Sequence, residues 1–325
     1  MKRIILLIIT ISLTLIVASC SNDSEGSSGM SNNLSIAAGT IGGGFHSGAT
    51  AVSSVINDNI EGVQANVEVT GSSVNNVELL QAGEVDLAFS STEVAWEAYH
   101  GKFTFEGNSH EKLRTLLPGW PGVWMFVTLE GNGIDSIHDL NGKSYSSGPK
   151  GSGNEVFASR VFNTFGIKPD IQNLPTSDAA DALKDGLIDG FSIAWPSEAI
   201  TELETSEEVK IVTLSEEENE AFLEENPPYP ILSIPPDVYN AVPDGREALG
   251  LYNLLLVSQD ISEEQVYNLL ETIYENESQI EQTWPQMASG MLYENVEETT
   301  IPYHPGAVKY FEDQGIEIPE DLKPE

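Results

Sequence analysis

The sequence has one cysteine and few basic residues, and both shortages restrict what the protein can be. A single cysteine cannot form a disulfide within the chain. The 14 lysines and arginines stand against 51 aspartates and glutamates, which gives a formal net charge of −37 at pH 7. Nucleic acid and anionic lipid are therefore poor partners, because their phosphates would meet a repulsive field. We interpret the acidic residues, which cluster in 202–225 and towards the C-terminus, as a solvated surface.

The sequence also lacks the motifs that mark common classes of enzyme. The five histidines show no paired metal spacing, and His110-Glu111 is not followed by the second histidine of an HExxH zinc motif. Neither a GxSxG nucleophile turn nor a phosphate loop ending in GK[ST] is present. The glycines of 39–44 do not have the spacing of the dinucleotide fingerprint. We therefore expect no catalytic residue, no metal and no cofactor.

The N-terminal apolar run, residues 4–17, is shorter than the roughly 20 residues that a membrane-spanning helix needs. It follows two basic residues and precedes small ones, which is the order of a secretion signal. The segment Val17-Ala18-Ser19-Cys20 resembles a bacterial lipobox, so we expect 1–19 to be a lipoprotein signal peptide, Cys20 to carry the lipid and 20–33 to be a flexible tether. The protein would then be extracytoplasmic and anchored to the cell membrane. A transmembrane anchor, or an incidental cysteine in a signal cleaved elsewhere, is the alternative.

The mature chain, roughly 305 residues, is longer than one hydrophobic core usually serves, so we expect two lobes. Apolar strands alternate with helices and end in loops rich in glycine and serine, a pattern typical of a largely parallel α/β sheet. The pattern restarts after 131–133, and the apolar segment 251–257 would return the chain to the first lobe. We expect lobe I to comprise 34–126 and 250–325, lobe II to comprise 127–249, and the two crossings to act as a hinge.

The periodicity of apolar residues predicts the individual elements. We expect strands at about 34–38, 63–69, 85–89, 123–129, 143–146, 171–174 and 251–257, with another ending at Trp195. We expect helices at about 45–57, 71–81, 155–165, 178–184, 263–275 and 305–314. In the helix after Ser262 the residues Val266, Leu269, Leu270 and Ile273 share one face, and Ser262 and Gln265 have the spacing of a capping box. The acidic segment 202–228 is interpreted as surface helix and loop.

Four polar loops follow predicted strand ends, at 39–46, 71–75 and 90–92 in lobe I and at 148–154 in lobe II. Ligands of open α/β sheets bind at the carboxyl ends of the strands. Glycine lets backbone approach a ligand closely, while hydroxyls and the free amides of helix starts donate hydrogen bonds to carboxylate oxygens. The repetition of such loops predicts a site for a small anion between the lobes.

Two further kinds of side chain are candidates for this site. Lys150, in the lobe II loop, would add positive potential that offsets the acidic surface, although a solvated surface lysine is the alternative. Phe45, Trp120, Trp124 and Trp195 would wall a cleft, but aromatic residues beside strands also serve as core residues.

An ordered set of motifs spans nearly all of residues 34–313. The motifs are AGTIGGGF at 38–45, TGSSVNN at 70–76, GEVDLA at 83–88, DLNGK at 139–143, GPKGSGNE at 148–155, DGLID at 185–189 and IPYHPGA at 301–307. In this order they resemble the TAXI family, the solute receptors of tripartite ATP-independent periplasmic (TRAP) transporters. The resemblance covers most of the chain, and the ordered set is far more specific than any single motif.

The resemblance implies a two-lobe periplasmic-binding-protein fold with a central cleft and hinge, which closes on a ligand and delivers it to TRAP membrane subunits. Glutamate, glutamine and 2-oxoglutarate are the ligands usually suggested for the family. Carried over motif by motif, the ligand-binding positions are Thr40, Phe45, His46, Ser72, Ser73, Ser90, Ser91, Thr92, Ser152, Gly153 and Asn154. The sequence departs from the family at Phe45-His46, where tyrosines are frequent, and at Lys150, where a small residue or proline is common, and both departures bear on the identity of the substrate.

Two other functions fit the same scaffold. A surface sensor or adhesion lipoprotein would use the two-lobe fold without a membrane subunit, since a fold does not fix a function. A secreted enzyme would need an activity that depends on Ser152 or His46.

Overall fold

The computed structural model describes residues 32–226, 228–291 and 293–324. The expected signal peptide, the lipid-bearing Cys20 and the tether as far as residue 31 lie outside the described residues. Within those ranges, no helix has both the length and the hydropathy that a membrane span requires.

A single mixed sheet runs through the molecule in the order β2-β1-β3-β10-β4-β7-β5-β6, with β8 paired to β4 and β9 paired to β10. Its strands are β1 (Asn33–Ala37), β2 (Gln64–Glu68), β3 (Leu87–Ser91), β4 (Leu113–Leu129), β5 (Ser144–Ser146), β6 (Asp170–Gln172), β7 (Gly190–Trp195), β8 (Val209–Val212), β9 (Ile231–Ile234) and β10 (Arg246–Ser258). The parallel pairs are β1 with β2 and β3, and β5 with β6 and β7. The expectation of a largely parallel sheet is wrong, because β4 and β10 pair antiparallel with each other and with their other neighbours.

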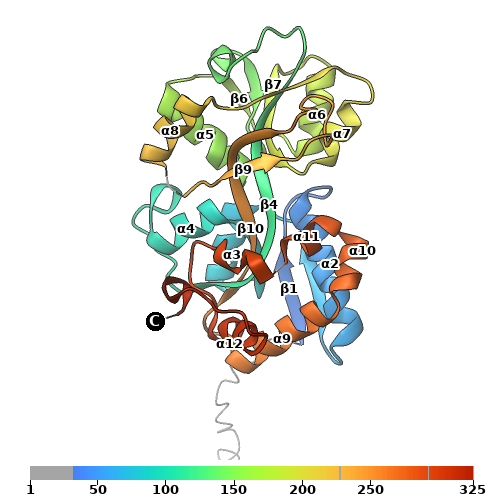
Figure 1. The fold of residues 1–325 in the computed structure, drawn as a ribbon, viewed down its shortest axis with the longest axis vertical. Helices are drawn as coiled ribbons and strands as arrows, with labels where there is room; N and C mark the ends of the chain where they lie inside the picture. The colour runs from blue at the N-terminus through green and yellow to red at the C-terminus, as the bar shows by residue number, and fades with distance from the viewer. Residues whose placement is uncertain (1–31, 227, 292, 325) are drawn as a thin grey trace, which may run out of the picture.

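The two long strands β4 and β10 join two halves of the molecule (Figure 1). We call the half that holds β1–β3 lobe I and the half that holds β5–β8 lobe II. Along β4, Leu117 belongs to the core of lobe I and Val123 to a core of lobe II. Along β10, Leu254 packs in lobe I and Leu251 in lobe II. The boundaries at 126/127 and 249/250 stay a prediction, because both strands run unbroken across those positions.

The helices cover both faces of the sheet in each lobe (Figure 1). Those of lobe I are α2 (Gly44–Asn59), α3 (Ser73–Ala82), α4 (Thr92–His100), α9 (Glu263–Glu275), α10 (Glu277–Thr283), α11 (Pro285–Gly290) and α12 (Pro305–Asp313). Those of lobe II are α5 (Gly153–Phe165), α6 (Thr176–Lys184), α7 (Glu198–Leu203) and α8 (Glu216–Glu225). Short 3-10 turns are η1 (Phe103–Phe105), η2 (Ile137–Leu140), η3 (Tyr293–Glu297) and η4 (Glu320–Leu322).

Helix α9 follows the predicted pattern. Its buried residues are Val266, Leu269, Leu270 and Ile273, which confirms the predicted apolar face. The Ser262 hydroxyl accepts a hydrogen bond from the Gln265 amide, at 3.4 Å, and so caps the helix. In a capping box the Gln265 side chain would accept a hydrogen bond from the Ser262 backbone amide. Here the side-chain oxygen of Gln265 accepts a hydrogen bond from the Ser262 hydroxyl instead, at 2.8 Å.

Several elements were not predicted from sequence. Strand β8 lies in the acidic segment 202–228, where we expected surface helix and loop, and its buried residues pair with β4. Helix α8 in the same segment agrees with that expectation. The first half of β4 contains two prolines, Pro118 and Pro121, which indicate a turn in sequence. The strand accommodates them because its register with β10 shifts between Tyr252 and Leu254. Helix α4 begins directly at the end of β3, inside a segment that we had expected to be a loop.

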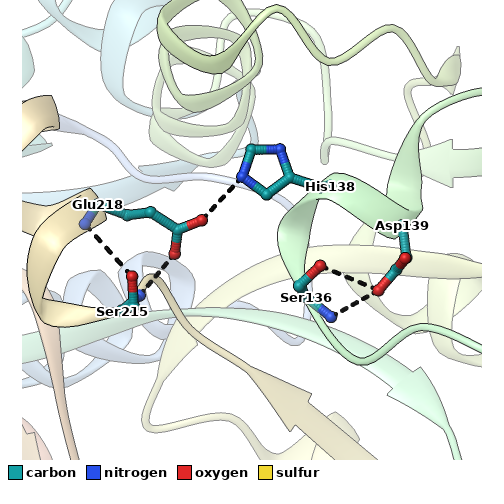
Figure 2. Close-up of polar contacts among 5 residues, drawn as sticks. All are labelled: Ser136, His138, Asp139, Ser215 and Glu218. Carbon is teal, nitrogen blue, oxygen red and sulfur yellow. Dashed lines mark hydrogen bonds and ion pairs between the residues drawn. The ribbon is translucent and has the colours of Figure 1, made fainter.

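Two capped turns are joined on lobe II, as Figure 2 shows. Ser136 with Asp139 forms a capping box at η2, and Ser215 with Glu218 forms another at the start of α8. The Nε2 atom of His138 lies 2.9 Å from Oε1 of Glu218 and links the two turns. These contacts hold α8 to η2, and the glutamates of its first turn suit the positive end of the helix dipole.

Candidate functional site

A cavity lies between the two lobes, with a volume of about 130 Å³. Lobe I supplies the loop after β1 and the starts of α3 and α4, and lobe II supplies the loop after β5 and the end of β7. The lining residues are Gly39, Thr40, Gly43, Gly44, Phe45, Ser72, Ser73, Ser91, Trp120, Trp124, Pro149, Ser152, Gly153, Asn154, Thr176, Ile193, Ala194, Trp195, Pro196, Leu251 and Asn253. A cavity of about 150 Å³ can hold benzene, so the size suits a small molecule.

Helix N-termini converge on this cavity. Helices α2, α3 and α5 begin at residues that line it, and the helix caps Gly43 and Ser72 form no side-chain capping bond. The first amides of a helix have no partner inside the helix, and the helix dipole places partial positive charge there. In the described part of the chain, no hydrogen bond uses the amides of Phe45, Ser73 or Gly153. Amides in this arrangement can bind an anion.

The remaining polar groups of the cavity are neutral. No charged side chain is among the lining residues, so neutral hydroxyl, amide and indole groups, such as those of Thr40, Asn154 and Trp124, are the side chains available for hydrogen bonds. The indole N–H of Trp124 is buried and has no hydrogen-bond partner in the described ranges.

Aromatic rings form the apolar wall on the lobe I side. Phe45 stacks on Phe89 with ring centroids 5.7 Å apart and meets Trp120 edge-on at 6.0 Å. Gly48 is needed beside them, because a Cβ at this position would lie 3.1 Å from the Trp120 ring. Because α2 lies close to Trp120, the start of α2 borders the cavity. Phe45 and Trp120 both line the cavity.

The two lobes are closed on each other beside the cavity. The Val74 amide, in the first turn of α3, donates a hydrogen bond of 3.0 Å to the carbonyl oxygen of Gly151 in lobe II. A Cβ on Gly71 would lie only 3.2 Å from the carbonyl oxygen of Lys150. These contacts join the glycine loops of opposite lobes, so the structure describes a closed arrangement.

The structure brings most of the predicted binding residues together. Those that line the cavity are Thr40, Phe45, Ser72, Ser73, Ser91, Ser152, Gly153, Asn154 and Trp195. Trp120 and Trp124, proposed as wall residues from sequence, line it too. Their role in binding a ligand stays a prediction.

Four predicted residues do not line the cavity, namely His46, Ser90, Thr92 and Lys150. His46 follows Phe45 on α2 and therefore points about 100° away from it. Ser90 and Ser91 are neighbours on β3, so their side chains point to opposite faces of the sheet. Thr92 accepts a hydrogen bond from the Tyr252 amide at 3.1 Å, and Lys150 is exposed to solvent.

Sequence reasoning missed several lining residues, among them Thr176 at the start of α6 and Asn253 on β10. Asn253 is held in place because its side-chain amide donates a hydrogen bond of 2.8 Å to the carbonyl oxygen of Trp120. The signal for Asn253 was a single polar residue inside the apolar run 251–257. Thr176 stands just before a predicted helix. A threonine at that position is common at ordinary helix starts, so it did not indicate a binding site.

The chain was compared with protein-family models and with solved structures. The model of the NMT1-like family matches residues 36–315. The structure of MatC from Rhodopseudomonas palustris with bound malate has a TM-score of 0.57, 12% sequence identity, and coverage of 87% of this chain and 96% of that one. An ancestral arginine-binding protein bound to arginine has a TM-score of 0.50, 17% identity, and coverage of 79% and 99%. The α/β two-lobe periplasmic-binding-protein fold expected from sequence is therefore confirmed.

Proposed function

Since this chain belongs to the NMT1-like family, we propose that it is an extracytoplasmic solute receptor that closes its two lobes on a small carboxylate. The observation that carries the proposal is the convergence of three helix N-termini, two from lobe I and one from lobe II, on one cavity without a charged lining residue. A ligand that bridges both lobes stabilises the closed state, because only that state offers it all of these contacts.

The chemistry of the lining supports a carboxylate over a cation. Unpaired amides and hydroxyls donate hydrogen bonds to carboxylate oxygens, whereas the cationic side chain of a ligand such as arginine would find no carboxylate among the lining side chains. The local positive potential of the helix starts is needed, because the chain as a whole carries a net charge of −37. MatC was solved with the dicarboxylate malate, which agrees with this chemistry.

More specifically, we propose a receptor of the TAXI type, with glutamate, glutamine or 2-oxoglutarate as ligand and the membrane subunits of a TRAP transporter as partner. The ordered motifs from residue 38 to residue 307 support this assignment. The proposal includes a lipid on Cys20 that anchors the protein to the membrane, lobes divided at 126/127 and 249/250, and binding without catalysis. Mass spectrometry of the membrane-extracted protein tests the lipid directly.

A thermal-shift screen tests the ligand class. The panel consists of 2-oxoglutarate, L-glutamate, L-glutamine, malate and L-arginine, and a ligand at about 100 times its dissociation constant adds about 2.7 kcal/mol to the free energy of unfolding. We expect at least one of the carboxylates to raise the melting temperature and L-arginine to bind more weakly. If no member of the panel shifts the melting temperature, the proposed ligand class is wrong.

A pair of asparagine variants tests the location of the site. Asn154 lines the cavity at the start of α5, and Asn163 lies on the same helix, exposed to solvent and away from the cavity. We expect Asn154→Ala to weaken binding by about tenfold, the effect of losing one hydrogen bond, while Asn163→Ala binds as the wild type does. Equal affinities of the two variants would place the ligand elsewhere.

A further inference from the structure

A second polar cluster lies between the lobes, behind the wall of the cavity. It consists of Glu93 and Glu97 on α4 in lobe I, with Arg160 on α5 and Tyr229 in lobe II. All four side chains are buried, and we call them the interlobe cluster. None of the four lines the cavity, so the proposed ligand site does not explain why two carboxylates are buried here.

A contact between Arg160 of lobe II and Glu97 of lobe I joins the two lobes. The Arg160 guanidinium forms an ion pair with the Glu97 carboxylate, and it lies over the Phe103 ring, 4.1 Å from the ring centroid. The Thr104 amide donates a further hydrogen bond of 3.4 Å to Glu97. Glu97 therefore has partners that stabilise its negative charge in the closed arrangement.

Glu93 is buried without such a partner. Neither of its carboxylate oxygens has a hydrogen-bond partner within the described residues. A Cβ on Gly153, at the start of α5, would lie 3.4 Å from Oε1 of Glu93, so the backbone of lobe II covers this carboxylate. Opening the lobes would move Gly153 and Arg160 away and return both glutamates of α4 to water.

The charges of the interlobe cluster do not balance. The charged and titratable groups that face Glu93 are Glu97 on its own helix, Arg160 on α5 and Tyr229 on the segment before β9. Arginine stays protonated in proteins and the tyrosine is neutral, so two ionised glutamates would leave one uncompensated negative charge among buried side chains. One bound proton removes that charge.

We propose that closing the lobes places one proton on Glu93, so that the receptor takes up its solute and a proton together. The inference rests on the proposed receptor function only in that ligand binding closes the lobes. Glu93 is a positioning residue in this scheme, because it acts on the lobes and does not contact the ligand.

The direction of the pKa shift agrees with the geometry. Burial raises the pKa of Glu93 from 4.5 to about 7, while the Ser91 hydroxyl, which lies near the carboxylate without meeting hydrogen-bond geometry, and the Arg160 guanidinium lower it only in part. In the open form water reaches the carboxyl group, and its pKa returns towards the ordinary value. The closed form thus has the higher pKa, so the protonation that favours closure is complete below the open-state value and is lost as the pH rises through about 7.

Isothermal titration tests the proposal on the full-length mature protein with 2-oxoglutarate, which has no group that titrates between pH 6 and 8. We expect the affinity to be about tenfold higher at pH 6 than at pH 8, with uptake of about 0.9 proton per ligand at pH 6, measured from buffers of different ionisation enthalpy. Glu93→Gln should bind with the same affinity at both pH values. The exposed Glu84→Gln, on a turn of lobe I, is the control and should keep the tenfold difference.

The outcomes separate this inference from the choice of ligand. Binding without proton uptake by the wild type, or a Glu93→Gln variant that keeps the tenfold difference, overturns the proposal. If neither 2-oxoglutarate nor L-glutamate binds, the ligand assignment fails and small-angle scattering of the ligand-free protein decides the matter. At pH 8 the Glu93→Gln variant should then be more compact than the wild type, and identical radii of gyration would refute the role of Glu93.

Discussion

Replacing Arg160 by methionine removes the cation that joins α4 to α5 across the cleft. Methionine keeps most of the length of the side chain and its contact with the Phe103 ring, but it leaves the Glu97 carboxylate unpaired in the closed form. Removing one partner of a buried ion pair costs about 3–5 kcal/mol when the other charge stays buried. Here the lobes can open, so Glu97 regains water without unfolding of either lobe.

The cost should therefore appear in ligand affinity and hardly at all in the stability of the ligand-free protein. Since 1.4 kcal/mol corresponds to a factor of ten, the lower end of the range predicts an affinity loss of about 100-fold. Isothermal titration measures the affinity, and thermal unfolding without ligand measures the stability. The double variant Arg160→Met/Glu97→Gln, which leaves no unpaired charge, should recover to within about tenfold of the wild type.

Two results would refute this reasoning. If Arg160→Met lowers the melting temperature of the ligand-free protein and leaves the dissociation constant unchanged, the ion pair stabilises the fold and not the closed state. If the double variant binds as weakly as the single one, the loss comes from the packing of the Arg160 side chain and not from the stranded charge of Glu97.

Further variants test the packing of lobe I, each by thermal unfolding of the ligand-free protein. Gly290→Ala should destabilise it by about 1–3 kcal/mol, because the added Cβ would overlap the backbone of Gly119, while Ser289→Ala on the same helix should have little effect. Leu270→Ala removes a fully buried side chain of α9 and should cost about 2–5 kcal/mol. Ser262→Ala removes the cap of α9 and should cost about 1 kcal/mol, and a loss above that of Leu270→Ala would contradict the assigned roles.

The part of the site that sequence could predict is the part made of loops that follow parallel strands. Strands β1 and β3 are parallel neighbours, so the glycine loop after β1 and Ser91 at the end of β3 meet at one edge of the sheet. Glycine and hydroxyl residues after each strand gave a local signal there. The side chain that was predicted on charge alone, Lys150, lies outside the cavity, because a charged residue in a loop carries no information about which way it points.

The interlobe cluster could not be predicted in this way. Glu93, Glu97 and Arg160 are ordinary charged residues of two helices, one of which was itself not expected. Their burial depends on the antiparallel course of β4 and β10, which brings α4 against α5 from opposite lobes. Asn253 depends on the same strand pairing, because its position is fixed by the carbonyl group of Trp120 on β4. Such contacts follow from the tertiary structure and leave no local pattern.

The acidic exterior and the neutral cavity are connected through closure. A carboxylate that approaches this protein meets a negative field, and the open cleft adds the charges of Glu93 and Glu97 to it. Closing the lobes pairs Glu97 with Arg160 and, under our proposal, neutralises Glu93, so the local field becomes less repulsive as the helix N-termini come together. The anion and the proton then favour the same closed state, and each raises the affinity for the other by the same factor.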